Sequence, residues 1–235
     1  MLYLWPCSGS MRDFSAQYGV LSSPQKWHVE TPVKEGRLWG MDNGAFKDGF
    51  NPVRFFDHLA KLEPYKDQCL FVVAPDRVGD AVATLALWET WAPQIPAIWP
   101  LAFVAQDGQE HLPFPDGCEW IFIGGTDEFK LGEGGRICIE RALIAGKRVH
   151  VGRVNSQKRY WYFERMGVHS CDGSGPTREP DNYHRLFDAA MARVSLFRGA
   201  LSGSNCGRQP IGGMVRQVGE CRKCFRLHRS GSCCA

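Results

Sequence analysis

The chain has 235 residues, of which 44% are hydrophobic and 23% charged, and its net charge at pH 7 is +3. This composition is typical of a globular protein with room for one large domain, and it argues against an intrinsically disordered chain. No apolar run approaches the roughly 20 residues of a membrane-spanning helix, and the first residues lack the basic and apolar regions of a signal peptide. We therefore expect a cytoplasmic protein with no membrane partner, whose ten cysteines are thiols or metal ligands rather than disulfides.

Short apolar runs alternate with longer amphipathic segments along most of the chain. The runs predicted as strands are residues 2–5, 38–41, 70–73, 98–104, 120–123, 148–151 and 167–170, with residues 18–21 as a candidate eighth strand. Apolar positions three and four residues apart predict helices at residues 52–62, 81–91, 136–145, 156–166 and 183–201. Such alternation is typical of a parallel α/β sheet, either open and doubly wound or closed into a barrel, and residues 1–201 are predicted to form this domain.

Two aspartates stand close behind predicted strands that are far apart in the sequence. Asp42 follows the strand at 38–41, and Asp172 follows the strand at 167–170. An acid at the carboxyl end of a barrel strand points into the catalytic mouth of the barrel. Two such acids can act as nucleophile and as proton donor on one glycosidic carbon. The alternative for each is a helix N-cap, a position at which Asp is also common.

Other strand ends carry groups that suit the recognition of a flat, polar ligand. Asp76 and Gln106 each lie just beyond a predicted strand, and so do Gly124 and Gly125. A carboxylate accepts hydrogen bonds, an amide also donates them, and glycine allows the backbone to approach a ligand closely. The alternatives are a turn residue for Asp76, a surface polar residue for Gln106 and an ordinary βα turn for the two glycines.

The remaining polar residues near these strand ends are predicted to be structural. Asp80, Asp127 and Ser156 are interpreted as helix caps. His150 and His169 are interpreted as strand histidines with satisfied hydrogen bonds rather than as catalytic groups. Cys171 lacks the His/Asn partner pattern of a thiol nucleophile, so we predict that it is a buried, small apolar residue.

The strand ends, taken together, resemble one enzyme family. Residues 41–46, Met-Asp-Asn-Gly-Ala-Phe, resemble the Asp-Ser-Gly-Gly-Phe signature of the tRNA-guanine transglycosylases. The other similar segments follow in the order of that family: Pro-Asp at 75–76, Phe-Val-Ala-Gln-Asp-Gly at 103–108, Ile-Phe-Ile-Gly-Gly-Thr-Asp-Glu at 121–128, His-Val-Gly-Arg-Val at 150–154 and His-Ser-Cys-Asp-Gly-Ser at 169–174. The glycine of the segment at 150–154 comes one residue earlier than in the family. The resemblance covers roughly residues 38–180.

This resemblance implies a TIM-like (β/α)8 barrel and a pentosyltransferase that exchanges a base through a covalent glycosyl-enzyme intermediate. It implies that Asp172 is the nucleophile and Asp42 the general acid/base. It also implies that Asp76 and Gln106 recognise the base. Further implied base contacts are the backbone at Gly124 and Gly125 and stacking on Phe46, with Met41 as an alternative. Neither a redox cofactor nor a nucleoside triphosphate is implied, since the chain has neither a Walker loop nor a Gly-x-Gly-x-x-Gly turn after a strand.

The chain is much shorter than the tRNA enzymes and lacks their Cys-x-Cys-x-x-Cys zinc insert. In this respect it resembles the small phage branch of the superfamily, which exchanges guanine in DNA for a 7-deazaguanine such as 7-cyano-7-deazaguanine and so protects phage DNA against host restriction. Single- or double-stranded DNA and a free 7-deazaguanine are the partners that this resemblance implies, and the host cytoplasm is the expected location.

Residues 202–235 are predicted to form a small, basic zinc-binding appendage. From Leu201 onward, six Lys/Arg and one Glu give a local charge of +5 and leave −2 for the rest of the chain, which favours a polyanionic partner at this end. A Cys-x2-Cys pair is typical of a tetrahedral, structural Zn²⁺ site. The predicted ligands are Cys221, Cys224, His228 and Cys233, with Cys206 and Cys234 as alternatives for the fourth. Neighbouring basic residues and Phe225 suit contacts with phosphates and bases, although a zinc clip that only closes the C-terminus is an alternative.

Three other functions fit the sequence. The chain is alternatively a tRNA-guanine transglycosylase, a DNA glycosylase or nucleosidase of the same fold, or a non-catalytic zinc protein that binds nucleic acid. Steady release of guanine without added deazaguanine indicates the glycosylase. Function that survives the loss of both Asp42 and Asp172 indicates the binding protein.

Overall fold

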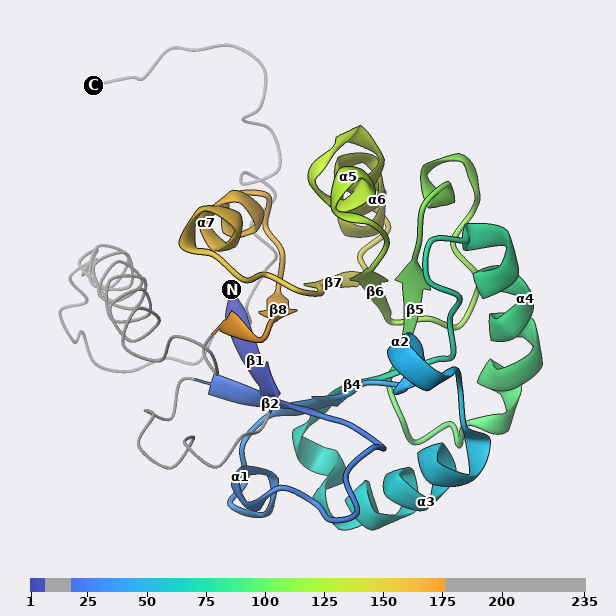
Figure 1. Ribbon diagram of the computed structural model, residues 1–235, viewed down its shortest axis with the longest axis vertical. Coiled ribbons are helices and arrows are strands. Elements are labelled where there is room, and N and C mark those ends of the chain that lie inside the picture. Colours follow the sequence, from blue (N-terminus) through green and yellow to red (C-terminus); the bar gives the residue numbers. More distant parts are fainter. Residues whose placement is uncertain (7–17, 176–235) are drawn as a thin grey trace, which may run out of the picture. The chain divides into compact units, whose positions relative to one another are not determined.

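The computed structural model describes residues 1–6 and 18–175, and these form a closed barrel of eight parallel strands (Figure 1). The strands are β1 (Leu2–Pro6), β2 (Tyr18–Ser22), β3 (Trp39–Met41), β4 (Cys69–Val73), β5 (Leu101–Ala105), β6 (Trp120–Ile123), β7 (Arg148–Val151) and β8 (Ser170–Asp172). Each strand pairs with the next in sequence order, and β8 closes the barrel on β1, where Leu4 is the register partner of Asp172. The predicted TIM-like barrel is thus confirmed, and β2 supplies the eighth strand.

Two strands begin three residues later than predicted. β5 begins at Leu101 rather than at residue 98, because residues 96–99 form a turn in which the Trp99 N–H donates to the Pro96 carbonyl (3.1 Å). β8 is shifted from 167–170 to Ser170–Asp172, since Gly167 adopts a left-handed conformation (φ 82°) and its N–H donates to the Glu164 carbonyl at the end of a helix. As a result Asp172 is the last residue of β8 rather than part of the loop beyond it.

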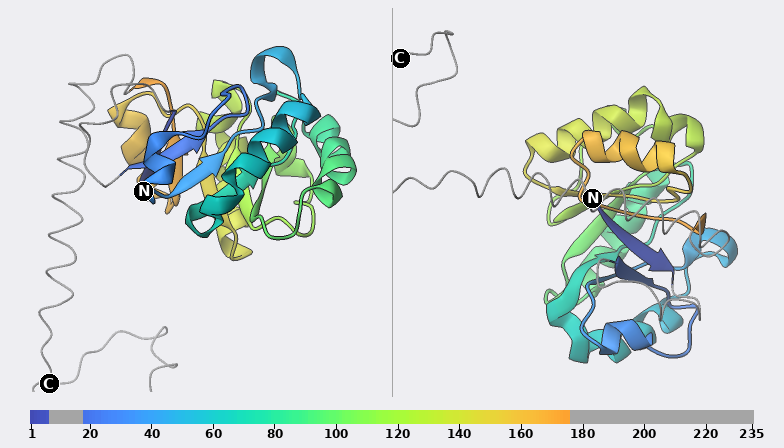
Figure 2. Two further views of the ribbon diagram at one scale, coloured as in Figure 1. Left: turned by 90° about the horizontal axis from the view of Figure 1, so that it is seen from below. Right: turned by 90° about the vertical axis from the view of Figure 1, so that its left-hand side faces the viewer.

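Most helices lie around the outside of the barrel, whereas α2 (Ala45–Asp48) lies over one end of it (Figures 1 and 2). The helices of the described residues are α1 (Thr31–Lys34), α2, α3 (Pro52–Leu62), α4 (Ala81–Trp91), α5 (Asp127–Leu131), α6 (Glu133–Ile144) and α7 (Gln157–Arg165), with 3-10 turns at Glu63–Gln68, Ala92–Gln94 and Gln109–His111. The predictions for α3 and α4 are confirmed to the residue, α6 begins earlier than predicted, and α7 is shorter by one residue at each end. The helix predicted at 183–201 lies outside the described residues.

Helix caps were predicted correctly at two positions and wrongly at one. The Asp80 side chain accepts from the Ala83 N–H at the start of α4 (2.9 Å), and the Ser156 side chain accepts from the Arg159 N–H at the start of α7 (3.3 Å). α5 is instead capped by Thr126, and Asp127 is the first helical residue. Asp127 there pairs with Arg159 (2.7 Å), so its charge supports the first turn without capping it.

Side chains alternate between the barrel interior and the layer beneath the helices, as the strand period of two requires. On β1, Leu4 belongs to an interior cluster with Phe71, Val73 and Val104, whereas its neighbours Tyr3 and Trp5 belong to the larger cluster that includes helix residues. Asp172, as the register partner of Leu4, shares the interior face.

The same alternation places Met41 and Cys171 on the other side. Met41 is fully buried in the larger cluster, between the strands and the helices, so it does not offer a stacking surface to a ligand in the barrel mouth. Cys171 is fully buried as well, which confirms it as a small core residue, and burial raises the pKa of its thiol well above the ordinary value.

Among the described residues, no helix has the length and apolar character needed to cross a bilayer.

Candidate active site

A pocket of about 550 Å³ opens at the carboxyl end of the barrel, where loops that follow several strands meet. This volume is sufficient for a purine-sized ligand. Every predicted catalytic and substrate-binding residue lines it: Asp42, Phe46, Asp76, Gln106, Gly124, Gly125 and Asp172. Neither Asp42 nor Asp172 caps a described helix, because α2 begins after Gly44 (φ 74°) without a side-chain cap and Asp172 ends a strand. The structure thus brings together residues that are up to 130 positions apart in the sequence.

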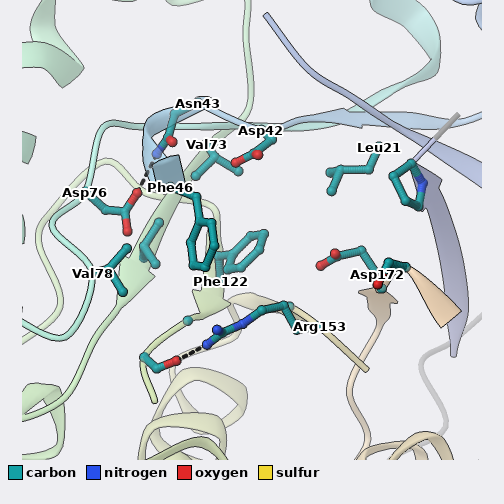
Figure 3. A pocket seen from close by; sticks show the side chains of 18 of the residues that line it. Leu21, Asp42, Asn43, Phe46, Val73, Asp76, Val78, Phe122, Arg153 and Asp172 are labelled. Carbon is teal, nitrogen blue, oxygen red and sulfur yellow. Dashed lines mark hydrogen bonds between the residues drawn. The ribbon is translucent and has the colours of Figure 1, made fainter. Parts of the chain in front are cut away.

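Asp76 is held on one side of the pocket by two amide side chains (Figure 3). The Asn43 Nδ2 donates to Asp76 Oδ1 (2.6 Å), and the Gln106 Nε2 donates to Asp76 Oδ2 (2.5 Å). Burial raises the pKa of Asp76, and the two amide hydrogen bonds oppose this effect by stabilising the carboxylate. Asp76 is therefore a fixed acceptor rather than a turn residue.

Gln106 is a buried organiser of the strand-end loops. Its side chain is only 2% exposed, so Gln106 is not the surface polar residue that the sequence left as an alternative. Its Oε1 accepts from the backbone N–H groups of Gly79 (2.9 Å) and Gly125 (2.8 Å), which leaves Nε2 as the donor to Asp76. The Gly125 N–H, predicted to contact a ligand directly, is thus engaged by Gln106. A side chain at Gly124 would come within 2.9 Å of the Gln106 amide, which explains why glycine suits that position.

Asp172 lies across the pocket from Asp76 (Figure 3). Its Oδ1 is 3.1 Å from His150 Nε2, and His150 Nδ1 is 2.8 Å from Ser170 Oγ. The other carboxylate oxygen, Oδ2, has no hydrogen-bond partner within the described part of the chain. His150 is fully buried, and burial lowers its pKa while the adjacent carboxylate opposes the shift. The prediction of a hydrogen-bonded strand histidine is confirmed, and its partner is the candidate nucleophile.

Asp42 projects into the pocket between these two sites (Figure 3). Its pKa is raised to about 7, first by burial and then by the negative charges of Asp172 and Asp76, while the backbone N–H groups of Asn43 and Gly44 oppose the shift. A carboxyl group with this pKa exchanges protons readily near neutral pH, which is the property required of a general acid/base.

The walls between the carboxylates are apolar and partly aromatic. Phe46, which is 61% exposed, and Phe122 extend toward the centre of the pocket, and Val73, Val78 and Val104 complete this lining. The Arg153 guanidinium lies 5.5 Å from the centre of the Phe46 ring and donates to the Gly125 carbonyl. Flat apolar walls with polar groups at both ends suit an aromatic heterocycle.

A buried lysine lies behind the loop that follows β7. Lys130 is 1% exposed, and its Nζ donates to the Gly152 carbonyl (2.7 Å), with Asp127 Oδ1 3.9 Å away. Burial and the charge of Arg153 lower the pKa of Lys130 to about 8, and the charges of Asp127 and Asp172 oppose this. Lys130 therefore contributes positive charge on the Asp172 side of the barrel mouth.

Sequence reasoning assigned no role to several residues of this site. Asn43 stood inside the motif at 41–46, but its contact with Asp76 spans 33 positions. Phe122 and His150 were placed on strands, and the alternation of side chains along those strands was the available signal that both face the barrel interior. Nothing in the sequence indicated that Arg153 would cover Phe46. His169, by contrast, accepts from the Val149 N–H (3.1 Å) and does not line the pocket.

The predicted zinc ligands Cys221, Cys224, His228 and Cys233 lie outside the described residues, as do the alternatives Cys206 and Cys234 and the predicted boundary at residue 201. Within residues 1–6 and 18–175, no group of three or more His, Cys, Asp or Glu side chains is placed to hold a metal ion. The zinc site therefore stays a prediction from the Cys-x2-Cys spacing.

A scan against protein-family models finds no match for this sequence, and a search of curated proteins finds no similar one.

Proposed function

We propose that the protein is a transglycosylase that exchanges guanine in DNA for a 7-deazaguanine through a covalent intermediate on Asp172. The observation that carries the proposal is the convergence of three carboxyl groups in one barrel mouth, each in a different setting. Asp76 is fixed by two amides, Asp172 has one oxygen without a hydrogen-bond partner among the described residues, and Asp42 has a pKa of about 7. The ordered resemblance to the tRNA-guanine transglycosylases assigns the same three residues to recognition, attack and proton transfer.

The proposed reaction has two displacements at C1′ of the deoxyribose. First, Asp172 Oδ2 bonds to C1′ as the C1′–N9 bond breaks, and the departing guanine takes a proton from Asp42. Second, the incoming 7-deazaguanine gives its N9 proton to the Asp42 carboxylate, and N9 bonds to C1′ as the ester to Asp172 breaks. Two inversions leave the configuration at C1′ unchanged, and no other reactant is required.

Recognition of the base is assigned to the Asp76 end of the pocket. The carboxylate can accept hydrogen bonds from the ring N–H and the exocyclic amine of a guanine-like base. Gln106 Nε2 has a second hydrogen that can reach the carbonyl oxygen, while its Oε1 stays bound to the Gly79 and Gly125 N–H groups. Phe46 and Phe122 supply faces against which the ring can pack. Guanine and 7-deazaguanines share this edge, so one pocket can serve both.

DNA is proposed as the polymeric substrate because of the resemblance to the small phage branch and the basic tail. The tail charge of +5 suits a polyanion, and a Zn²⁺ ion on Cys221, Cys224, His228 and Cys233 would hold the basic segment in a fixed fold. The target base must leave the helix stack to reach a pocket of this kind, and extrusion costs a few kcal/mol.

Guanine exchange tests the proposal directly. DNA with radiolabelled guanine is incubated with the full-length protein, with and without 7-cyano-7-deazaguanine. Label should be released only when the deazaguanine is present, and Asp172→Asn should abolish release. Asp80→Asn is the matched control, because Asp80 caps α4 at the same end of the barrel and Asn caps helices equally well.

Other outcomes assign other functions. Steady release of guanine over many turnovers without the added base makes the protein a DNA glycosylase, and release from tRNA alone makes it a tRNA enzyme. No release from either substrate, with DNA binding retained in an Asp42→Ala, Asp172→Ala double variant, makes it a nucleic-acid-binding protein.

A further inference from the structure

We propose that His150 is a positioning residue that holds one oxygen of Asp172, so that the other oxygen faces the reacting carbon. This inference rests on the proposed function, because it assigns Asp172 the nucleophilic role. It concerns a chain of three side chains, Ser170–His150–Asp172, which is defined here as the β7–β8 relay.

The relay connects two adjacent strands inside the barrel. His150 on β7 is the register partner of Ser170 on β8, and Asp172 lies two residues further along β8 on the same face. Nδ1 of the ring is 2.8 Å from Ser170 Oγ, and Nε2 is 3.1 Å from Asp172 Oδ1. Ser170 is 1% exposed and His150 is fully buried, so the ring and its contact with Ser170 are shielded from solvent, while the Asp172 side chain is 13% exposed at the pocket.

The direction of the hydrogen bonds follows from the chemistry of the three groups. An ionised carboxylate only accepts, so Nε2 must carry the hydrogen of the Nε2–Asp172 contact. Burial, and then the charge of Lys130, hold the pKa of His150 below its ordinary value against the influence of Asp172, so a second proton on the ring is disfavoured at neutral pH. Nδ1 of a neutral ring is then an acceptor, and the Ser170 hydroxyl donates to it. Ser170 thus selects the tautomer that donates to Asp172.

Aromatic packing fixes the orientation of the ring. The ring centres of Phe71 and Phe122 lie 4.9 Å and 4.5 Å from that of His150. Gly152, two residues beyond His150, leaves room for this arrangement, because a Cβ there would lie 2.7 Å from Phe122 and 3.4 Å from Asp172 Oδ1. With its ring held in place, His150 can fix the Asp172 carboxylate in the plane needed for attack by Oδ2.

The test compares two substitutions of His150 in the exchange assay with the full-length protein. His150→Phe fits among the aromatic rings but cannot donate, and the expected loss in kcat is on the order of 10²-fold, the cost of a misplaced reacting group. The KM for 7-cyano-7-deazaguanine should change little, because the Asp76 end is not altered. His150→Gln, which retains a donor, should recover part of the loss, and His169→Gln is the control at a histidine outside the pocket. The thermal midpoints of all variants establish that they are folded.

A second measurement does not depend on activity. The ¹⁵N shifts of the imidazole nitrogens at pH 7 report the tautomer of His150, and His150→Gln identifies its signals among the seven histidines. The expected result is a neutral ring with hydrogen on Nε2. Hydrogen on Nδ1, or full exchange activity in His150→Phe, overturns the inference and leaves the proposed function intact. Absence of exchange in the wild-type protein overturns the proposed function, and the role of His150 in it, even if the tautomer is as expected.

Discussion

Asp76 and Asp172 end up on opposite sides of the same pocket, yet their surroundings differ in one decisive respect. Both oxygens of Asp76 accept short hydrogen bonds from amide side chains, whereas Asp172 has one oxygen bound to His150 and one without a partner in the described residues. A carboxylate with both oxygens engaged by neutral donors is suited to binding. A carboxylate with one oxygen fixed and one free is suited to attack, because its lone pairs are oriented and unoccupied.

Asp42 differs from both, since burial and two nearby carboxyl groups raise its pKa to about 7. The proposed reaction therefore assigns recognition, attack and proton transfer to three carboxyl groups that differ in their surroundings rather than in residue type. Substitutions that remove one of these surroundings should affect one step and spare the others, and the following predictions test that separation.

The largest effect is expected at Asp42. Asp42→Asn should lower the single-turnover rate of guanine release by roughly 10²- to 10⁴-fold, the usual contribution of a general acid. In the wild-type protein that rate should fall as the pH rises above about 7, because the carboxyl with a pKa of about 7 loses the proton it must donate. Quenched-flow measurement of guanine release between pH 5 and 9 records both effects. A wild-type rate that is flat over this range, or an Asn variant with unchanged rate, would assign proton transfer to another group.

The same carboxyl should make the fold less stable as the pH rises from about 4 to about 7. Its folded-state pKa of about 7 lies above the ordinary value of 3.8, so the folded state binds the additional proton between these values. Stability contributed by this group is therefore complete below about pH 4 and is lost as the pH rises to about 7. Asp42→Asn removes the effect. When the pH is raised from 4 to 8, the unfolding free energy of the wild-type protein should therefore fall by about 2–4 kcal/mol more than that of the variant. Urea unfolding of both proteins at the two pH values measures the difference.

A smaller effect is expected when Asp76 loses one amide. Asn43→Ala removes the donor to Asp76 Oδ1 and also the Asn43 contacts with the Ala74 carbonyl and the Ala45 N–H. A buried carboxylate with one bond fewer should bind the base about 10- to 100-fold more weakly, which corresponds to 1–3 kcal/mol for an unsatisfied polar group. Calorimetric titration with 7-cyano-7-deazaguanine measures the affinity.

The control for Asn43 is Asn51→Ala, which removes the N-cap of α3. This variant should lose about 1 kcal/mol of stability with unchanged affinity for the base. If both variants lose affinity equally, general destabilisation explains the loss and the binding role of Asn43 is wrong. The predicted separation of binding from attack also requires that Asn43→Ala still forms the covalent intermediate once DNA is saturating.

The sequence allowed prediction of what depends on local period and on strand order. Alternating strands and helices predicted the barrel, and because parallel strands end at one face, Asp42 and Asp172 were expected in the same mouth. The hydrogen bonds that give each carboxyl its character were not predicted. The contacts of Asn43 and Gln106 with Asp76 span 33 and 30 positions, and that of His150 with Asp172 spans 22, so they exist only once the barrel has closed.

Errors at the ends of elements have a similar origin. Residues 167–169 were predicted to begin a strand that continues to Ser170. Gly167 instead adopts a left-handed conformation that ends α7, so β8 begins only at Ser170. Asp127 and Thr126 are both good N-caps, and the Thr126 hydroxyl prevails while also donating to Asp107 Oδ1 (2.5 Å) across the strand ends. Such choices depend on tertiary partners that no short window of sequence contains.

The smallest effect is expected at Arg153, which lies between the two sides of the pocket. It is the one described non-glycine residue with positive φ (59°), and its guanidinium joins the Gly125 carbonyl to the face of Phe46. Arg153→Gln should lose a cation–π contact of about 0.5–1 kcal/mol at this exposed ring, and so weaken base binding about two- to fivefold with little change in kcat. The control is Arg159→Gln, which breaks only the exposed pair with Asp127 and should leave affinity unchanged. A loss of 50-fold or more in Arg153→Gln would contradict a purely supporting contact and show that the guanidinium itself binds the base. In that case recognition would extend beyond the Asp76 side, and the division between a binding carboxylate and a reacting carboxylate would no longer describe the pocket.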